Sequence, residues 1–464
     1  MRKSCNGFLV FLSILLLVGC GNGGGGDSGC TADSDCAGGQ ICEVVQGGTA
    51  KCFFPLEIRG IVEDIIDDEP IGGSLVQAAD PNGAALGTSA KTGIDGRFTL
   101  TVPATRDSSG KPVAGDYTLR AQASGYQIFP SAVRPALPLA AETAVQDGDR
   151  WAIDNALTTI KLLPLGDTSG LGSISGSILT EQNAGILVVA EGPTTTGYPG
   201  FSDSEGDYTI FNVPAGPYTV RGFVAGIQLN PANTTLTAEE DKTGVDLTES
   251  ERALSSVSGN IQIVDAPGGS MTSVVLAVES TFVKSVGRGL VPPGLRVGDV
   301  TGNFTIENVP DGKYVVLAAF ENDGLVRDPD ETIAGTGIVR VELPDPEMGN
   351  TVTVGGFKVT EALEVFFPGA EGPEAISITA PTFQWAFDPS AKHYEVYVYD
   401  AFGNGVWSNT NIGSEEGQTI YCKYGGSALE EGMFYQFRAF SFNNAAVAIS
   451  ATEDLKGVFY LTNP

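Results

Sequence analysis

Four cysteines in one short segment carry the clearest chemistry in this sequence. Cys30, Cys36, Cys42 and Cys52 are separated by five, five and nine intervening residues. Zinc ligands usually come as pairs two to four residues apart, and these spacings fit that pattern poorly. In an exported chain such a group is typical of disulfides. We therefore predict two disulfides among these four residues, with three possible connectivities that the sequence leaves open.

The sequence offers few residues for catalysis, because it has one histidine, His393. Zinc peptidase sites, Ser-His-Asp triads and Cys-His pairs all need at least one well-placed histidine. The 56 acidic residues make carboxylate pairs available by chance anywhere. Asp203–Asp207 and Glu63–Glu69 offer oxygen ligands for calcium, but neither forms a complete twelve-residue calcium loop. We expect no enzyme activity, no cofactor and no metal site.

The first residues indicate export. Arg2 and Lys3 precede the apolar stretch Phe8–Val18, which is the plan of a signal peptide and is too short for a permanent membrane span. Leu17-Val18-Gly19-Cys20 resembles a bacterial lipobox. The resemblance implies a signal peptide over 1–19, lipid attachment at Cys20 and, because Gly21 follows, location in the outer membrane on its periplasmic or surface side. The alternative is an ordinary secretory signal cleaved near Gly19.

Charge agrees with an exported body. The chain has a net charge of −30, and cleavage after residue 19 would also remove Arg2 and Lys3. Nucleic acid is therefore an improbable partner, and the acidic residues suit a solvated surface. The expected partners are the membrane, through the lipid anchor, and an envelope or extracellular polysaccharide or protein. The glycine-rich segment 20–29 is expected to be a flexible tether.

Residues 30–52 follow the tether. Cys30-Thr-Ala-Asp-Ser-Asp-Cys36-Ala-Gly-Gly-Gln-Ile-Cys42 resembles small modules found after the lipid anchor of many bacterial lipoproteins. The segment is too small to own a hydrophobic core, so its crosslinks must hold it, at roughly 3 kcal/mol each.

Three internal repeats fill the middle of the chain. Each has an opening strand pattern, a Gly-x-aromatic turn and a Val-Pro block followed by Gly-x-Tyr. The opening patterns start at Arg59, Ser175 and Ser258; the turns are Asp95–Leu100, Glu205–Ile210 and Thr301–Ile306; the last blocks end in Leu119, Val220 and Val316. Glycine in the turn is expected to supply positive φ, and proline to end a strand. The first repeat alone inserts Thr105–Ala114.

This pattern resembles the carboxypeptidase regulatory-like domain, a transthyretin-like β-sandwich, over residues 56–165, 171–249 and 254–360. The peptidase part of a carboxypeptidase is absent, so the resemblance implies an accessory role without hydrolysis. Residues 361–464 resemble a fibronectin type III-like domain, in which Trp385 and Tyr435 would be core residues. Cys422 is expected to be a buried thiol. The predicted fold class is all-β: tandem β-sandwiches after a small disulfide-rich module.

Two functions remain open at this stage. The first is a non-enzymatic, lipid-anchored scaffold or adhesin, in which a string of sandwiches projects the last domain. The alternative is a carbohydrate-binding surface lipoprotein, since transthyretin-like and starch-binding sandwiches often stack exposed aromatic rings on sugars. The candidate stacking residues are Trp151, Tyr198, Phe201 and Trp407. A row of coplanar exposed rings would favour sugar binding, and buried rings the scaffold.

Overall fold

The structure is a computed structural model. It describes residues 29–464 except 81–84, 131–135, 137–138, 194–195, 285–287, 319–323, 328–336, 346, 373, 401–404, 415–416, 418, 432, 454–455 and 462–464. The predicted signal peptide, Cys20 and residues 21–28 lie outside the described residues. Within the described part the chain is all-β, with four short 3₁₀ helices, at Asp33–Asp35, Ala141–Thr143, Ala156–Thr158 and Glu279–Thr281. That part has no helix with the length and apolar character of a membrane span.

A small hairpin precedes the first β-sandwich. The hairpin comprises β1 (Ile41–Glu43) and β2 (Lys51–Phe53). One sheet of the sandwich contains β3 (Leu56–Asp64), β6 (Arg97–Val102), β11 (Val145–Asp147), β12 (Arg150–Ile153) and β13 (Thr159–Leu162); the other contains β4 (Leu75–Ala79), β5 (Ala85–Lys91), β9 (Asp116–Gln122) and β10 (Leu139–Ala140). The insertion Thr105–Ala114 forms its own hairpin, β7 (Thr105–Arg106) with β8 (Pro112–Ala114).

The second and third sandwiches repeat this plan. The second has β14 (Leu171–Leu179), β17 (Asp207–Pro214), β20 (Asp241–Lys242) and β21 (Leu247–Thr248) facing β15 (Leu187–Glu191), β16 (Gly197–Phe201), β18 (Gly216–Phe223) and β19 (Ala232–Leu236). The third has β22 (Ser255–Val264), β25 (Asn303–Val309), β27 (Leu325–Arg327), β29 (Thr351–Thr353) and β30 (Phe357–Glu361) facing β23 (Thr272–Val278), β24 (Arg296–Val300), β26 (Gly312–Ala318) and β28 (Val339–Leu343). In all three, the opening strand pairs antiparallel with the strand after the glycine turn and parallel with strands near the domain's end.

The C-terminal sandwich has a different strand order. Its smaller sheet contains β31 (Val365–Phe367), β33 (Thr382–Ala386) and β36 (Thr419–Lys423); its larger sheet contains β32 (Glu374–Ile376), β34 (His393–Asp400), β35 (Gly405–Gly413), β37 (Phe434–Phe442), β38 (Ala448–Ala451) and β39 (Val458–Leu461). Trp385 and Tyr435 lie in its core, and Cys422 is buried, as predicted.

A glycine opposite an aromatic ring recurs in the three repeats. Gly60 pairs with Phe98, Gly176 with Tyr208 and Gly259 with Phe304. A Cβ atom on Gly60 or Gly259 would lie only 2.7 Å from the facing ring. A Cβ atom on Gly60 or Gly176 would also lie 2.1 Å from the backbone carbonyl oxygen of Thr158 or Val245, so the opening strand needs glycine at this position.

A second contact that recurs in the three repeats is a hydrogen bond from the tyrosine that follows each Val-Pro block. The hydroxyl groups of Tyr117, Tyr218 and Tyr314 donate to the carbonyl oxygens of Pro103, Pro214 and Pro310, at 2.6, 2.8 and 2.8 Å. The first repeat keeps this bond although its insertion separates the two residues. The insertion therefore leaves the framework of the sandwich unchanged.

Turn geometry differs in part from the expectation. Gly96 and Gly206 have φ of 71° and 90°, as predicted, but Gly302 does not adopt positive φ. In the third repeat the positive φ falls on Asp299, at 54°. Asp tolerates this conformation better than most non-glycine residues, and Asp299 lies inside β24, whereas the turn itself stays at Thr301 and Gly302, between β24 and β25.

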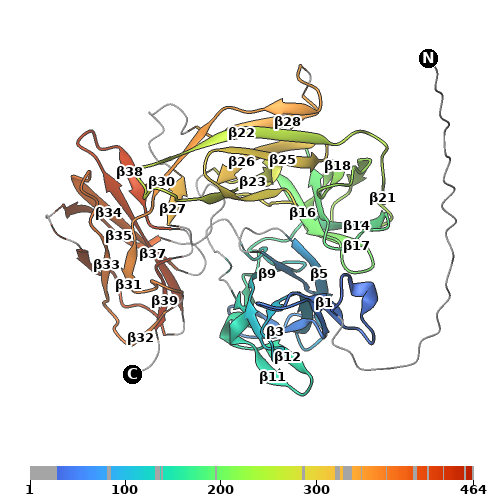
Figure 1. The fold of residues 1–464 in the computed structure, drawn as a ribbon, viewed down its shortest axis with the longest axis horizontal. Coiled ribbons are helices and arrows are strands. Elements are labelled where there is room, and N and C mark those ends of the chain that lie inside the picture. The colour runs from blue at the N-terminus through green and yellow to red at the C-terminus, as the bar shows by residue number, and fades with distance from the viewer. Residues whose placement is uncertain are drawn as a thin grey trace, which may run out of the picture.

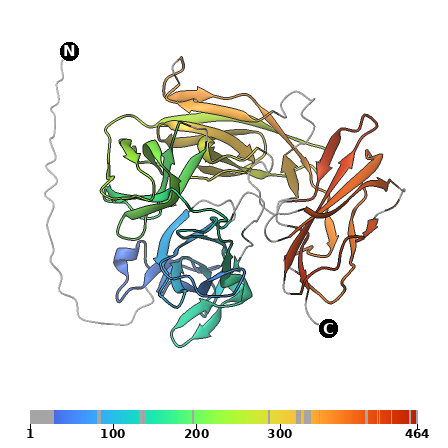
Figure 2. The ribbon, with the colours of Figure 1, turned by 180° about the vertical axis from the view of Figure 1, so that it is seen from behind.

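The three repeats do not extend in a line. Leu187, Val189 and Phe223 of the second sandwich share one hydrophobic cluster with the core of the third, and Ala85 of the first joins it. Figures 1 and 2 show the three sandwiches gathered together, with the cysteine-rich hairpin and the C-terminal sandwich at opposite ends of the long axis. The expected string of sandwiches is thus a folded-back cluster.

Candidate functional site

The cysteine-rich segment contains the predicted disulfides. Cys30 bonds Cys42, and Cys36 bonds Cys52, which resolves the connectivity. The sulfur atoms of Cys30, Cys36 and Cys52 lie within 4.8 Å of one another because the two bridges adjoin. All four sulfur atoms are bonded in disulfides, so the structure uses this cluster as a crosslink.

A buried ion pair fixes this segment to the first sandwich. Nε of Arg106 lies 2.5 Å from Oε2 of Glu43, and both side chains are 1% exposed. Oε1 of Glu43 accepts from the backbone N–H of Ala104, and Nη2 of Arg106 donates to the carbonyl of Phe54. Burial is the largest influence on the Glu43 carboxyl and raises its pKa. We call this contact the clamp.

Sequence reasoning missed the clamp. The insertion Thr105–Ala114 was identified without a role, yet this hairpin supplies Arg106. The backbones also pair, since Arg106 donates to Val44 and accepts from Gln46. The insertion is therefore the docking element for the cysteine-rich segment, and it occurs only in the repeat that follows that segment.

A second recurrent element joins successive sandwiches. The loop after the tyrosine strand carries a glycine with positive φ in each repeat: Gly125, Gly226 and Gly324, at 81°, 86° and 78°. Each donates its backbone N–H to the following domain over 2.8 Å. The acceptors are Oδ1 of Asn212, the carbonyl oxygen of Asn308 and Oε1 of Glu453. We call these contacts the glycine joints.

Bulges in the second and third sandwiches form the receiving side of two glycine joints. Asn212 and Asn308 have φ of 58° and 60°, and each lies where one strand residue faces two. The first sandwich pairs Leu56 with Val102 and Ile58 with Leu100 without an extra residue. Bulges redirect a strand locally. A bulge between the opening strand and the strand after the glycine turn occurs only in the two repeats that receive a preceding domain.

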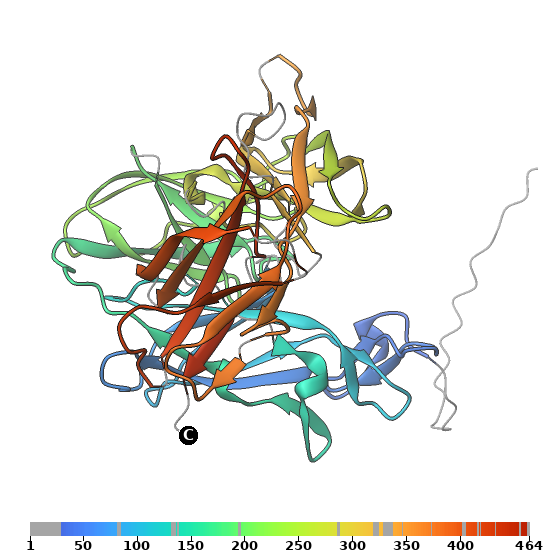
Figure 3. The same ribbon diagram turned by 90° about the vertical axis from the view of Figure 1, so that its left-hand side faces the viewer.

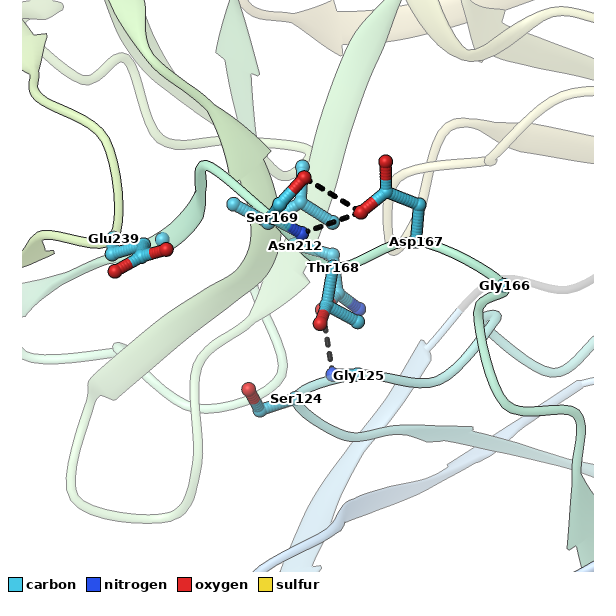
Figure 4. A pocket seen from close by; sticks show the side chains of 10 residues that line it. Ser124, Gly125, Gly166, Asp167, Thr168, Ser169, Asn212 and Glu239 are labelled. Carbon is cyan, nitrogen blue, oxygen red and sulfur yellow. Dashed lines mark hydrogen bonds between the residues drawn. The ribbon is translucent and has the colours of Figure 1, made fainter.

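A cleft lies beside the first glycine joint. Its volume is about 610 Å³, and its lining is mainly polar, with Ser124, Asp167, Thr168, Ser169 and Glu239 around Asn212. Figure 4 shows Asp167 accepting from the N–H and hydroxyl of Ser169, and Gly125 bonded to Asn212. Nδ2 of Asn212 also donates to the carbonyls of Ala123 and Tyr126. The polar groups here mainly hold the joint.

Charged side chains mark the contact of the first sandwich with the other two. The guanidinium of Arg120 lies 4.5 Å from the centre of the Phe201 ring of the second sandwich. Burial lowers the pKa of Arg120 to about 10, against the opposing influence of Asp80. Asp80 also pairs with Arg296 of the third sandwich at 3.1 Å. Charged groups thus accompany Ala85 at this contact, whereas the cluster between the second and third sandwiches is apolar.

The four candidate stacking residues do not share a surface. Trp151 packs against the first core, and Tyr198 against the second core with Tyr218. Phe201 is 5% exposed and faces Arg120. Trp407 lies over Gly425 and Gly426, next to Tyr424. Tyr198 and Phe201 lie on the same strand, β16, but none of the four rings contacts another of the four.

Other chemical candidates have structural contacts. His393 stacks on Phe442, with ring centres 4.8 Å apart. Oδ1 of Asp203 accepts from the N–H groups of Glu205 and Asp207, which closes the predicted repeat turn. Asn409 donates to the sulfur of Cys422, and burial raises the pKa of that thiol, which disfavours the reactive thiolate.

Comparisons with known proteins give the following. No protein-family model and no curated protein matches the chain. Among solved structures, it is similar to the Bacillus anthracis TIE protein, with 13% identity, 85% of this chain and 68% of that chain covered, and a TM-score of 0.16. It is also similar to the shaft pilin SpaA of Lactobacillus rhamnosus GG, with 11% identity, coverage of 42% and 99%, and a TM-score of 0.18. A streptococcal ancillary pilin is similar with 11% identity, 65% of this chain and 98% of that chain covered, and a TM-score of 0.16. Scores this low carry no inference about function.

Proposed function

We propose that this protein is a non-enzymatic, lipid-anchored cell-envelope scaffold or adhesin that holds its C-terminal sandwich away from the membrane. The supporting observation is the arrangement of joints. The clamp fixes the anchor-side segment to the first sandwich, and the shared cluster makes the second and third sandwiches one body. The C-terminal sandwich lies at the far end of the long axis (Figures 1 and 2).

The proposal includes the family relations and the anchor. The repeated two-sheet plan, with four or five strands facing four and with its glycine-aromatic pairs, supports carboxypeptidase regulatory-like sandwiches for the three repeats. The buried Trp385 supports a fibronectin type III-like sandwich at the C-terminus. Cys20 would carry the lipid, with the outer membrane as the location. The partner would be an envelope protein or polysaccharide that meets the C-terminal sandwich.

The test uses Cys20→Ala in the full chain. We expect the wild type to incorporate labelled palmitate and fractionate with the outer membrane, and the variant to lose the label and become soluble. Cys422→Ala is the matched control, because that thiol is buried in the C-terminal sandwich. Unlabelled wild type, or a variant that stays in the membrane, would refute the anchor. A tag after Pro464 that antibodies reach on intact cells would place the C-terminal sandwich outside the cell.

A further inference from the structure

The smaller sheet of the C-terminal sandwich exposes two aromatic rings on its outer face. Val365, Trp385 and Ile420, one from each of its strands, are buried in the core. Side chains that alternate with them point outward, because successive residues of a strand face opposite sides. Among the outward set, Tyr421 of β36 is 62% exposed and Phe366 of β31 is 38% exposed. The outer face therefore meets solvent at both of its edge strands.

The two rings lie on either side of a glutamine. Gln384 of the central strand β33 pairs with Tyr421 on one side. On the other side it faces the bulge between Val365 and Phe367, of which Phe366 is the extra residue. Bulges re-aim a side chain, and the backbones of β31 and β36 lie two strand spacings apart, about 10 Å. We call Phe366, Gln384 and Tyr421 the aromatic row; none of the four rings predicted from the sequence belongs to it.

The polar groups of the aromatic row are free to bind a ligand. Among the described residues, no side-chain hydrogen bond involves Gln384 or Tyr421, nor the hydroxyl groups of Thr382 and Thr419 on the same face. Within the same part of the chain, the rings of Tyr421 and Phe366 contact no other ring. The amide of Gln384 can donate and accept hydrogen bonds. A sugar carries hydroxyl groups at its rim and C–H groups on its flat sides, so it can stack on an aromatic ring and bond an amide at the same time.

The outer face of the smaller sheet carries little charge. Its three strands contain one charged residue, Lys423, in a chain whose net charge is −30. The acidic chain as a whole repels a polyanion, whereas it leaves an uncharged polymer unaffected. A single base is too little to hold an acidic polysaccharide against that repulsion. Charge therefore favours an uncharged ligand.

The size of the face suits a saccharide better than a protein. Three strands about 4.8 Å apart and four residue steps of about 3.3 Å give a backbone footprint of roughly 10 by 13 Å. A stable protein interface buries about 800 Å² on each partner, which is several times this area. A polysaccharide needs only a narrow platform, because its chain is one sugar wide. The aromatic row crosses all three strands and provides such a platform.

We propose that the aromatic row binds an uncharged polysaccharide. Tyr421 and Phe366 stack on sugars of one polysaccharide chain, and Gln384 bonds the hydroxyl groups between them. Figure 3, viewed from the C-terminal side, shows the C-terminal sandwich in front of the other three, which suits a domain that meets an external polymer. This site depends on the proposed function, in which the C-terminal sandwich meets the partner, and it selects polysaccharide over protein as that partner.

Affinity electrophoresis of the full chain with Cys20→Ala tests the site in the absence of the proposed anchor. The native gels contain hydroxyethyl cellulose, amylose or galactomannan as uncharged probes, and alginate as an acidic one. We expect at least one uncharged polymer to slow the protein increasingly as the polymer concentration rises, and alginate to have no such effect. Tyr421→Ser and Phe366→Ser should each weaken binding about tenfold, as loss of one good aromatic contact does. Gln384→Ala should weaken it less.

Tyr399→Ser is the matched control, because Tyr399 is a partly exposed tyrosine of β34 in the larger sheet. It should bind as well as the protein with an intact aromatic row. Tyr421 is 62% exposed, so serine there leaves the core in place, and an unchanged melting temperature confirms this. Absence of retardation by every uncharged polymer, retardation by alginate alone, or equal losses in Tyr421→Ser and Tyr399→Ser would overturn the aromatic row as a binding site. None of these results bears on Cys20, whose palmitate label tests the anchor separately.

Discussion

The third sandwich makes two joints that differ in kind. Toward the second sandwich, Phe223 and Tyr314 lie edge to face at 6.0 Å inside a cluster that spans both domains. Toward the C-terminal sandwich, the contacts among the described residues are hydrogen bonds such as Gly324 to Glu453, and the two cores are separate. A shared apolar core couples the unfolding of two domains, whereas a polar joint leaves each its own stability. The second and third sandwiches should therefore form one cooperative unit, and the C-terminal sandwich another.

Phe223→Ala tests the coupled unit most strongly. Phe223 is fully buried, and loss of such a ring costs about 3–5 kcal/mol of unfolding free energy. We expect hydrogen–deuterium exchange to accelerate in both β18 and β26, with β37 unchanged. Phe437→Ala, which removes an equally buried ring from the C-terminal core, should accelerate exchange only in that sandwich. Exchange confined to the second sandwich in Phe223→Ala would show that the cluster does not couple the two.

Arg106→Ala tests the clamp, a third kind of joint. Removing one partner of a buried ion pair costs about 3 kcal/mol or more, since the other charge is left unpaired. We expect residues 30–54 to lose exchange protection and both disulfides to become easier to reduce. Replacing both partners, as Glu43→Leu with Arg106→Met, should restore much of the docking. If Arg106→Ala leaves the rate of reduction unchanged, the clamp does not hold the segment.

Local patterns predicted much of this molecule. The cysteine spacing gave two disulfides, and the Gly-x-aromatic and Val-Pro blocks gave three sandwiches, because those signals depend on neighbouring residues. Trp385 was placed in a core for the same reason. The sequence also contains a signal for the shared cluster. Ile186–Ala190 and Val274–Val278 are continuous apolar runs, which are typical of strands buried on both faces.

Contacts between distant residues could not be predicted in this way. Glu43 and Arg106 lie 63 residues apart, and nothing in either neighbourhood marks them as partners. Phe201 was predicted to be an exposed ring, although it is 5% exposed and faces Arg120 of the first sandwich. The sequence shows which side chains are apolar, but which face meets another domain depends on how the sandwiches fold back.

Asn212→Ala and Asn308→Ala compare two matched joints. Both residues have positive φ, where alanine costs about 1 kcal/mol. Asn212 also bonds the first sandwich through its side chain, whereas Asn308 meets Gly226 through its backbone carbonyl. We expect Asn212→Ala to cost about 2–3 kcal/mol in chemical denaturation and Asn308→Ala about 1. Equal losses would mean that the side-chain bonds contribute nothing at the first joint.

Ser450→Ala probes the polar joint with the least disturbance. The Ser450 hydroxyl, in a side chain 5% exposed, donates to the Glu361 carbonyl at 2.5 Å and so links the third sandwich to the last. Ser441→Ala is the matched control, because its buried hydroxyl bonds Asp388 within the C-terminal sandwich. Each loses one hydrogen bond, worth about 1 kcal/mol. Ser441→Ala should lower the melting temperature of the C-terminal sandwich, whereas Ser450→Ala should leave it in place and raise exchange only beside the joint. If Ser450→Ala lowers that melting temperature as far as Ser441→Ala does, the C-terminal sandwich draws stability from its neighbour, and the contrast between the two joints of the third sandwich fails.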